Sequence, residues 1–169
     1  MDSETIVEVA EYHNDVVASL RYFSKTSPSF VSTRYFGRPL ADLLADRIEE
    51  TDLRSAFFVL AALEAAFRID YLYRCQKKMK DDLSRAFRVI YKNREGNADL
   101  DEDIFEIWKE KSSIPGPRLI GELRGAFKFR HYLAHGRYWE PKLGRKYDFN
   151  FIYSLADDVL KAFPLLKFD

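Results

Sequence analysis

The chain has 169 residues, a length typical of one domain, and 47% of them are apolar, which suffices for one sizeable core. Lysine plus arginine equal aspartate plus glutamate at 27 each, so the total charge gives no sign of a polyanionic partner. The single cysteine, Cys75, excludes an internal disulfide framework and a multi-thiolate metal site, which suits a reducing cytosol.

The first segment has the apolar spacing of a helix, with one residue in every three or four on the same face. This spacing predicts a helix over residues 3–25, followed by a break in the Ser- and Thr-rich stretch 26–37. The stripe consists of Ile6, Val9, His13, Val16, Leu20 and Phe23. The acidic N-terminus lacks the basic start and apolar core of a secretory signal, so we expect a cytoplasmic protein.

Two helices are predicted in the next part of the chain. Pro39 suits the first turn of a short helix that continues to about Ile48, because its missing N–H is no loss there. A longer, largely buried helix is predicted from Asp52 to about Met79, a range without Gly or Pro. Its stripe consists of Leu53, Phe57, Leu60, Phe67, Tyr71 and Cys75. The longest apolar run, residues 56–63, is too short for a membrane span of roughly 18–20 residues.

Shorter helices follow. Asp81 or Asp82 caps a helix that includes Phe87, either separate from the preceding helix or continuous with it, until residues 94–99 interrupt. An acidic helix over residues 99–111 is expected to bury Ile104, Phe105 and Trp108. The Pro- and Gly-containing stretch 112–117 is the clearest break in the sequence.

Two more helices complete the prediction. Pro117 opens a helix that ends near Gly136, a residue type that favours helix C-termini. Asp148 or Asn150 caps the last helix, and Pro164 ends it. The stripe of the last helix consists of Ile152, Leu155, Ala156, Val159 and Phe163. The sequence therefore predicts an all-α, up-and-down bundle of four main helices with short accessory helices, in a single domain over residues 1–169.

Positive charge is concentrated between residues 117 and 146. This segment contains eight basic residues and only two acidic ones, and aromatic residues are interleaved with the basic ones. Cations that contact phosphates, together with aromatic rings that stack on bases, are typical of single-stranded nucleic acid binding. The candidate RNA-binding residues are Lys128, Arg137, Tyr138 and Trp139. A solvated basic face is the alternative interpretation of the same run.

Two oppositely charged residues fall within apolar stripes. Arg130 lies three residues after Phe127, and Glu64 lies three residues before Phe67. Burying either charge without a partner would cost several kcal/mol. Each side chain therefore turns to the surface, or the two form an ion pair that joins the helices, or the bundle holds Arg130 beside His135 for use on a phosphate.

His131 and His135 are one helical turn apart. Both could reach one metal ion, but a zinc site needs three or four ligands, and neither His13 nor any acidic motif completes the set. No metal or other cofactor is therefore expected.

Histidine exchanges protons near neutral pH and arginine binds phosphate oxygens, so His135 with Arg130 fits metal-free RNA cleavage. Five residues of regular helix separate the two by roughly 140°, so they cannot share one narrow stripe. Either the helix unwinds near Gly136, or the site lies along a helix edge that a second protomer completes.

The stretch "RHYLAHG", residues 130–136, resembles the Arg, four to six residues, His signature of HEPN domains, whose name stands for higher eukaryotes and prokaryotes nucleotide-binding. Glu64 in "ALEAAFRIDYLYR" is similar to an acidic residue in an earlier helix of the RNase-like branches. The resemblance covers about a third of the chain. It implies a HEPN-like bundle and a metal-independent endoribonuclease that acts as a homodimer, with Arg130 and His135 as the catalytic pair, His131 assisting and Glu64 supporting.

Many HEPN proteins are toxins or antiviral effectors, often silenced by a nucleotidyltransferase-type antitoxin, so the resemblance also implies such a partner. Some members bind nucleotides or partners without cleaving RNA. A catalytically silent helical dimer that binds nucleic acid, a nucleotide or a partner through the same basic surface is therefore a second hypothesis. A structural interaction domain, in which Arg130 and His135 have no chemical role, is a third.

Overall fold

The computed structural model describes residues 3–26, 29, 33, 37–112, 116–137 and 144–168. This part of the chain is all-α, with six α-helices packed as a bundle and no strand. The helices are α1 (Ser3–Thr26), α3 (Leu40–Gln76), α4 (Asp82–Arg94), α5 (Glu106–Lys111), α6 (Pro117–Ala134) and α7 (Phe149–Ala162). A 3₁₀ turn, η1 (Glu95–Asn97), and a wide helical turn, η2 (Leu100–Phe105), connect α4 to α5. The expected all-α class and the packing of the helices as a bundle are confirmed.

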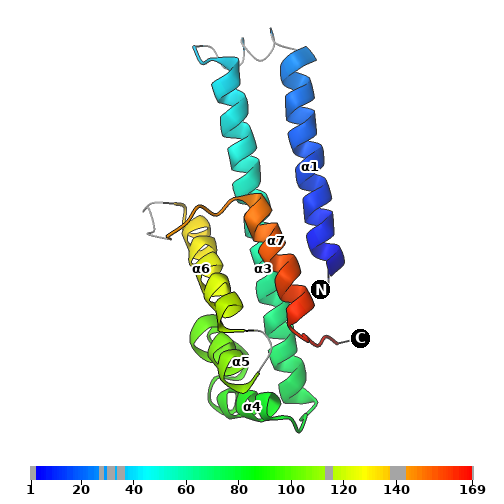
Figure 1. The fold of residues 1–169 in the computed structure, drawn as a ribbon, viewed down its shortest axis with the longest axis vertical. Coiled ribbons are helices and arrows are strands. Elements are labelled where there is room, and N and C mark those ends of the chain that lie inside the picture. The colour runs from blue at the N-terminus through cyan, green and yellow to red at the C-terminus, as the bar shows by residue number, and fades with distance from the viewer. Residues whose placement is uncertain are drawn as a thin grey trace.

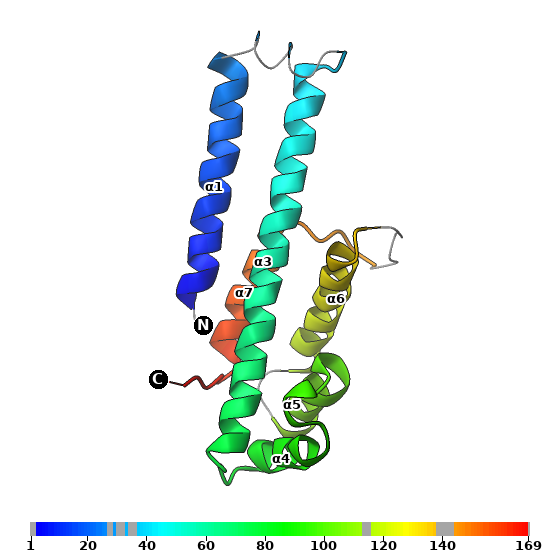
Figure 2. The same cartoon turned by 180° about the vertical axis from the view of Figure 1, so that it is seen from behind.

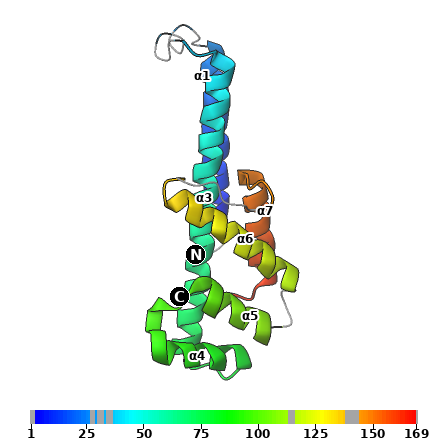
Figure 3. The ribbon, with the colours of Figure 1, turned by 90° about the vertical axis from the view of Figure 1, so that its left-hand side faces the viewer.

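Helix α3 is the axis of the molecule (Figure 1). α1 runs antiparallel to it on one side, and α6 lies on the other side, as both opposite views show (Figure 2). The first half of α3 and much of α1 extend beyond the remaining helices as a two-helix hairpin (Figure 3). The short helices α4 and α5 lie at the far end of α3.

The two helices predicted over residues 39–48 and 52–79 are one continuous helix, so that expectation was wrong. Asp52 lies within this helix and does not start one, and its carboxylate accepts a hydrogen bond from the His13 side chain at 2.7 Å. The Thr51 hydroxyl donates to the Arg47 carbonyl at 2.8 Å, which is compatible with a helix interior. The helix ends at Gln76, and the next turn contains Lys78 with φ of 51°.

Most predicted helix ends are confirmed, and the structure decides between the open alternatives. Asp81, rather than Asp82, caps α4 by accepting a hydrogen bond from the Ser84 backbone N–H at 2.9 Å. Asp148, rather than Asn150, caps α7 by accepting from the Phe151 N–H at 2.9 Å. Pro117 opens α6, where an N–H would have no partner within the helix.

One hydrophobic cluster joins side chains from all six helices. Its largest fully buried members are Trp108, Tyr71, Phe67, Phe87 and Phe105. The predicted stripe of the last helix is buried throughout, and Cys75 is a buried free thiol, as expected. In the described residues, no helix is both long enough and apolar enough to cross a membrane.

Candidate functional site

The C-terminus of α6 fixes the position of the predicted catalytic residues. The helix stops because Gly136 adopts φ of 77°, a left-handed conformation that glycine tolerates. The Arg137 N–H then donates to the Tyr132 carbonyl at 3.2 Å, and the His135 N–H donates to the His131 carbonyl at 3.1 Å. This is the hydrogen-bonding pattern of a glycine-terminated helix. His135 is consequently exposed just beyond the last helical residue.

Arg130 faces α3, where it meets Glu64. Its Nη2 atom lies 3.0 Å from Glu64 Oε2, while Arg68 Nε donates to Glu64 Oε1 at 2.9 Å. Arg68 also donates to the Ala98 carbonyl at 3.0 Å. The side chains are only partly accessible, with 31% of Arg130 and 18% of Glu64 exposed. Of the alternatives that the sequence left open, the structure thus contains the ion pair that joins the two helices.

An aromatic ring also contacts Arg130. Its guanidinium carbon lies 5.5 Å from the centroid of the Phe57 ring, a cation–π distance. The Nε atom is buried and has no hydrogen-bond partner among the described residues. The guanidinium is therefore fixed by a carboxylate and an aromatic ring, both from α3, and retains one N–H donor that no described residue uses.

His131 and His135 are brought together by the helix. Their ring centroids lie 4.1 Å apart with an interplanar angle of 53°, and both side chains are exposed. In the part of the chain that the structure describes, no hydrogen bond or ion pair joins Arg130 to His135. The two imidazoles lie together at the exposed end of α6, whereas the Arg130 guanidinium faces α3.

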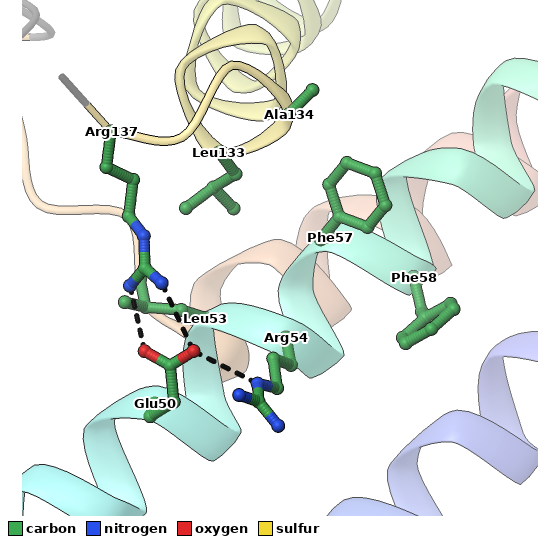
Figure 4. Close-up of a pocket in the computed structure, with 8 residues that line it drawn as sticks. All are labelled: Glu50, Leu53, Arg54, Phe57, Phe58, Leu133, Ala134 and Arg137. Carbon is green, nitrogen blue, oxygen red and sulfur yellow. Dashed lines mark hydrogen bonds and ion pairs between the residues drawn. The ribbon is translucent and has the colours of Figure 1, made fainter.

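Arg137 lies at the mouth of a pocket between α3 and the end of α6 (Figure 4). Its two terminal nitrogens contact the two carboxylate oxygens of Glu50 at 2.8 and 3.1 Å, in the bidentate geometry typical of arginine and carboxylate. Arg54 Nε donates to the same Glu50 carboxylate at 3.0 Å. The hydrogen bond from Arg137 holds the pKa of Glu50 below its usual value, despite partial burial.

The pocket beside this ion pair has a volume of about 320 Å³. Its walls combine aliphatic and aromatic side chains with the charged groups at the rim. The lining residues are Glu50, Leu53, Arg54, Phe57, Phe58, Leu133, Ala134 and Arg137. Because Phe57 also contacts Arg130, the pocket adjoins the predicted catalytic residues.

Of the four predicted RNA-binding residues, the structure describes two. Lys128 is exposed on α6, and Arg137 is exposed but paired with Glu50. Tyr138 and Trp139 lie outside the described residues. Sequence reasoning missed Glu50, because nothing near it in the sequence indicates a partner 87 residues further along the chain.

A second charged cluster, also missed, lies in the core. Arg74 Nε donates to Asp70 Oδ1 at 2.8 Å, and Arg74 Nη2 donates to the Pro164 carbonyl at 3.0 Å. The Leu166 N–H donates to Asp70 Oδ1 at 2.9 Å, so the pair attaches the C-terminal segment to α3. Burial raises the pKa of Asp70 to about 6 against the opposing effects of Leu166 and Arg74. The sequence could have indicated this pair, because Asp70 and Arg74 are four residues apart on a helix and lie within an apolar stripe.

His13, considered as a third metal ligand, is placed elsewhere. Its Nε2 atom lies 2.7 Å from Asp52 Oδ1, and its ring stacks on Phe149 with centroids 3.8 Å apart. These contacts attach α1 to α3 and α7. Among the described residues, no group of three or more His, Cys, Asp or Glu side chains is placed to hold a metal ion.

Comparison with known proteins adds no relative to this description. No protein-family model, curated protein or solved structure matches the chain. The functional proposal below therefore depends on the chemistry of the residues at the end of α6 and on their partners in α3.

Proposed function

We propose that this protein is a metal-independent endoribonuclease that cleaves single-stranded RNA with Arg130 and His135, on a HEPN-like helical bundle. The observation that carries the proposal is the fixed position of Arg130, held by Glu64 at 3.0 Å and by the ring of Phe57, on the same helix whose exposed end carries two paired imidazoles. A permanent cation next to groups that exchange protons is what phosphodiester cleavage by the ribose hydroxyl requires.

The proposed reaction is an internal transfer at phosphorus. An unprotonated His135 imidazole removes the proton of the 2′-hydroxyl, and the resulting oxygen attacks the adjacent phosphorus. The bond from phosphorus to the 5′-oxygen breaks, and that oxygen takes up a proton from an imidazolium. The products are a 2′,3′-cyclic phosphate and a 5′-hydroxyl, with no water, metal or oxidant consumed.

Arg130 has the electrostatic role in this reaction. Its guanidinium stabilises the extra negative charge that develops on the phosphoryl oxygens in the transition state. The ion pair with Glu64 reduces the net charge of the site but orients the guanidinium, so Glu64 acts as a positioning residue. His131, 4.1 Å from His135 between ring centroids, assists by exchanging a proton with the same phosphate group.

A second protomer completes the cleft in this proposal. Arg130 faces α3 while His135 is exposed at the helix end, so one phosphate reaches both groups best when a second copy supplies one of them. Lys128 and Arg137 then contact flanking phosphates, and Tyr138 and Trp139 stack on bases. The resemblance to HEPN domains leads us to propose a toxin or defence effector, controlled by a nucleotidyltransferase-type antitoxin.

A cleavage assay on single-stranded RNA in the presence of EDTA tests the proposal. The wild-type protein is expected to cut RNA, leave DNA intact and produce 2′,3′-cyclic phosphate ends. Arg130→Ala and His135→Ala are expected to lower the cleavage rate at least about a hundredfold, the usual scale for general acid–base or charge-stabilising groups. Arg118→Ala is the matched control, because Arg118 is a 90% exposed cation at the other end of α6. Equal cleavage by all three variants would refute the assignment.

The second hypothesis is a catalytically silent dimer that binds nucleic acid, a nucleotide or a partner. It is favoured by the pairing of two candidate cations, Arg130 with Glu64 and Arg137 with Glu50, which lowers the charge available to a transition state. Salt-sensitive RNA binding without any scission, unchanged in His135→Ala, would support this alternative.

A further inference from the structure

Two hollows, which together we call the α1–α3 groove, lie along the hairpin that α1 forms with the first half of α3. One part, of about 470 Å³, has two charged lining residues, Glu8 and Arg54. Its other lining residues are Val9, Tyr12 and Val16 of α1 and Thr51, Ser55 and Phe58 of α3. The other part, of about 260 Å³, is lined by Leu20, Phe23, Leu40, Leu43, Leu44 and Arg47, with Ser24. Side chains of α1 and α3 alone form both parts. The hairpin thus presents an apolar furrow along a face of its own.

The apolar residues of α1 that line this groove are symmetrically spaced along the helix. Its apolar members are residues 9, 12, 16, 20 and 23, with separations of three, four, four and three. This is the spacing of a helix seam that packs against another helix. A twofold axis near Val16 would place residue 12 opposite residue 20, and residue 9 opposite residue 23. The stripe is therefore complementary to a reversed copy of itself, over about 21 Å of helix.

The charges on α1 match the same arrangement. Residues 3–15 contain four acidic side chains and no lysine or arginine, and residues 16–26 contain Arg21 and Lys25 and no acidic side chain. Arg47 lines the groove beside the basic half. Antiparallel stacking of α1 on its copy places the acidic half of one α1 against the basic half of the other.

We propose that a second copy of this chain docks on the α1–α3 groove, face to face and antiparallel, with the twofold axis close to Val16. The two hairpins then form a four-helix bundle that buries Tyr12 and Phe58, which are 69% and 61% exposed in the single chain. This interface involves only α1 and α3 and does not depend on RNA cleavage.

This interface also determines where the two candidate sites lie, a consequence that rests on the proposed function. α6 lies on the side of α3 away from α1. The twofold axis lies in the plane of the interface and is perpendicular to the helices. It stacks α3 of one copy against α3 of the other, so the α6 ends of both copies lie on the same edge of the dimer. Phe58 and Arg54 line both the groove and the pocket beside Arg137, so the docked copy reaches the rim of the site.

The oligomeric state of the full chain, measured without RNA by sedimentation or light scattering, tests the interface. The wild-type chain is expected to be a dimer at micromolar concentration. Tyr12→Glu is expected to raise the dimer dissociation constant about thirtyfold or more, because it buries a charge at the seam. Tyr22→Glu is the matched control: Tyr22 is on the same helix and 71% exposed, but it does not line the groove. Circular dichroism checks that both variants remain helical.

Disulfide crosslinking tests the orientation. Val16→Cys is expected to form a covalent dimer, because the two copies of residue 16 meet at the axis. A mixture of Val9→Cys and Phe23→Cys chains is expected to give the mixed disulfide, whereas Val9→Cys alone is expected to remain monomeric under denaturing conditions. A monomeric wild-type chain, an undiminished Tyr12→Glu dimer or self-crosslinking of Val9→Cys would overturn the proposal. Loss of RNA cleavage with an intact dimer would instead count only against the proposed function.

Discussion

Glu64 of α3 and Arg130 of α6 form an ion pair at 3.0 Å in a partly buried position, and Glu64 also accepts a hydrogen bond from Arg68 at 2.9 Å. One carboxylate therefore orients two guanidinium groups from two helices. Removing it leaves both cations without their shared partner, so the structure assigns Glu64 a role in stability and in the orientation of Arg130.

We expect Glu64→Ala to lower the free energy of unfolding by about 1–3 kcal/mol, since it strands Arg130 in a partly buried position. Glu49→Ala, an exposed change on the same helix, is expected to stay within about 0.5 kcal/mol of wild type. Chemical denaturation measures both. If Glu64 positions Arg130 for cleavage, Glu64→Ala also slows RNA cleavage under conditions where the variant is fully folded. Equal unfolding free energies for the two variants would show that the ion pair has no structural role.

The bidentate pair between Glu50 and Arg137 competes with phosphate for the same guanidinium. Glu50→Gln removes that competing charge and is expected to tighten RNA binding about threefold to tenfold at low salt. The control is Glu49→Gln, which makes the same change of charge at the neighbouring residue. Fluorescence anisotropy with labelled RNA over a series of salt concentrations compares the RNA affinities of the two variants. If the two variants bind RNA equally well, Arg137 does not contact the nucleic acid.

The buried Asp70 predicts an unusual pH dependence of stability. Its pKa is raised from 3.8 to about 6 by burial, so between these values the folded chain binds a proton that the unfolded chain has released. The contribution of Asp70 to the free energy of unfolding therefore falls as pH rises from about 4 to 6, and is constant above. The size of this change is on the order of 2–3 kcal/mol.

Comparison of wild type with Asp70→Asn by urea denaturation at several pH values isolates this effect. Glu50 and Asp81 have lowered pKa values and act in the opposite direction, but they are present in both proteins. The stability advantage of wild type over the variant should shrink from pH 4 to pH 6. An advantage that grows over this interval would show that Arg74 and the Leu166 N–H outweigh burial.

Two glycines of α6 form a matched pair for a packing test. A methyl group at Gly125 would lie 2.2 Å from the Tyr147 hydroxyl, whereas Gly121 faces open space. Tyr147 is buried and stacks on Phe129, with ring centroids 5.4 Å apart, so its ring cannot move without disturbing the core. We expect Gly125→Ala to destabilise the protein by about 1–3 kcal/mol.

Gly121→Ala is expected to stabilise it by about 0.5–1 kcal/mol, because alanine favours helix and meets no neighbour there. The melting temperatures of the two variants and the wild type test both expectations. If Gly125→Ala melts at or above the wild-type temperature, Tyr147 does not pack against α6 as described.

The sequence by itself determined the helical class and most helix ends. Asp81, Asp148, Pro117 and Gly136 act through groups within a few residues of themselves, so local chemistry is enough to place them. The candidate site residues on α6 were also identified from sequence, through the spacing of Arg130 and His135. Their proposed catalytic roles remain predictions.

Only the tertiary structure decided which charged groups meet. Asp52 looked like a helix start but lies within the single long α3, where its side chain is the partner of His13. Glu50 pairs with Arg137, and Asp70 binds the Leu166 N–H, across 87 and 96 residues of chain. Such contacts depend on how the helices pack in space, and the apolar spacing that predicts a helix does not specify which charged side chains will lie opposite one another.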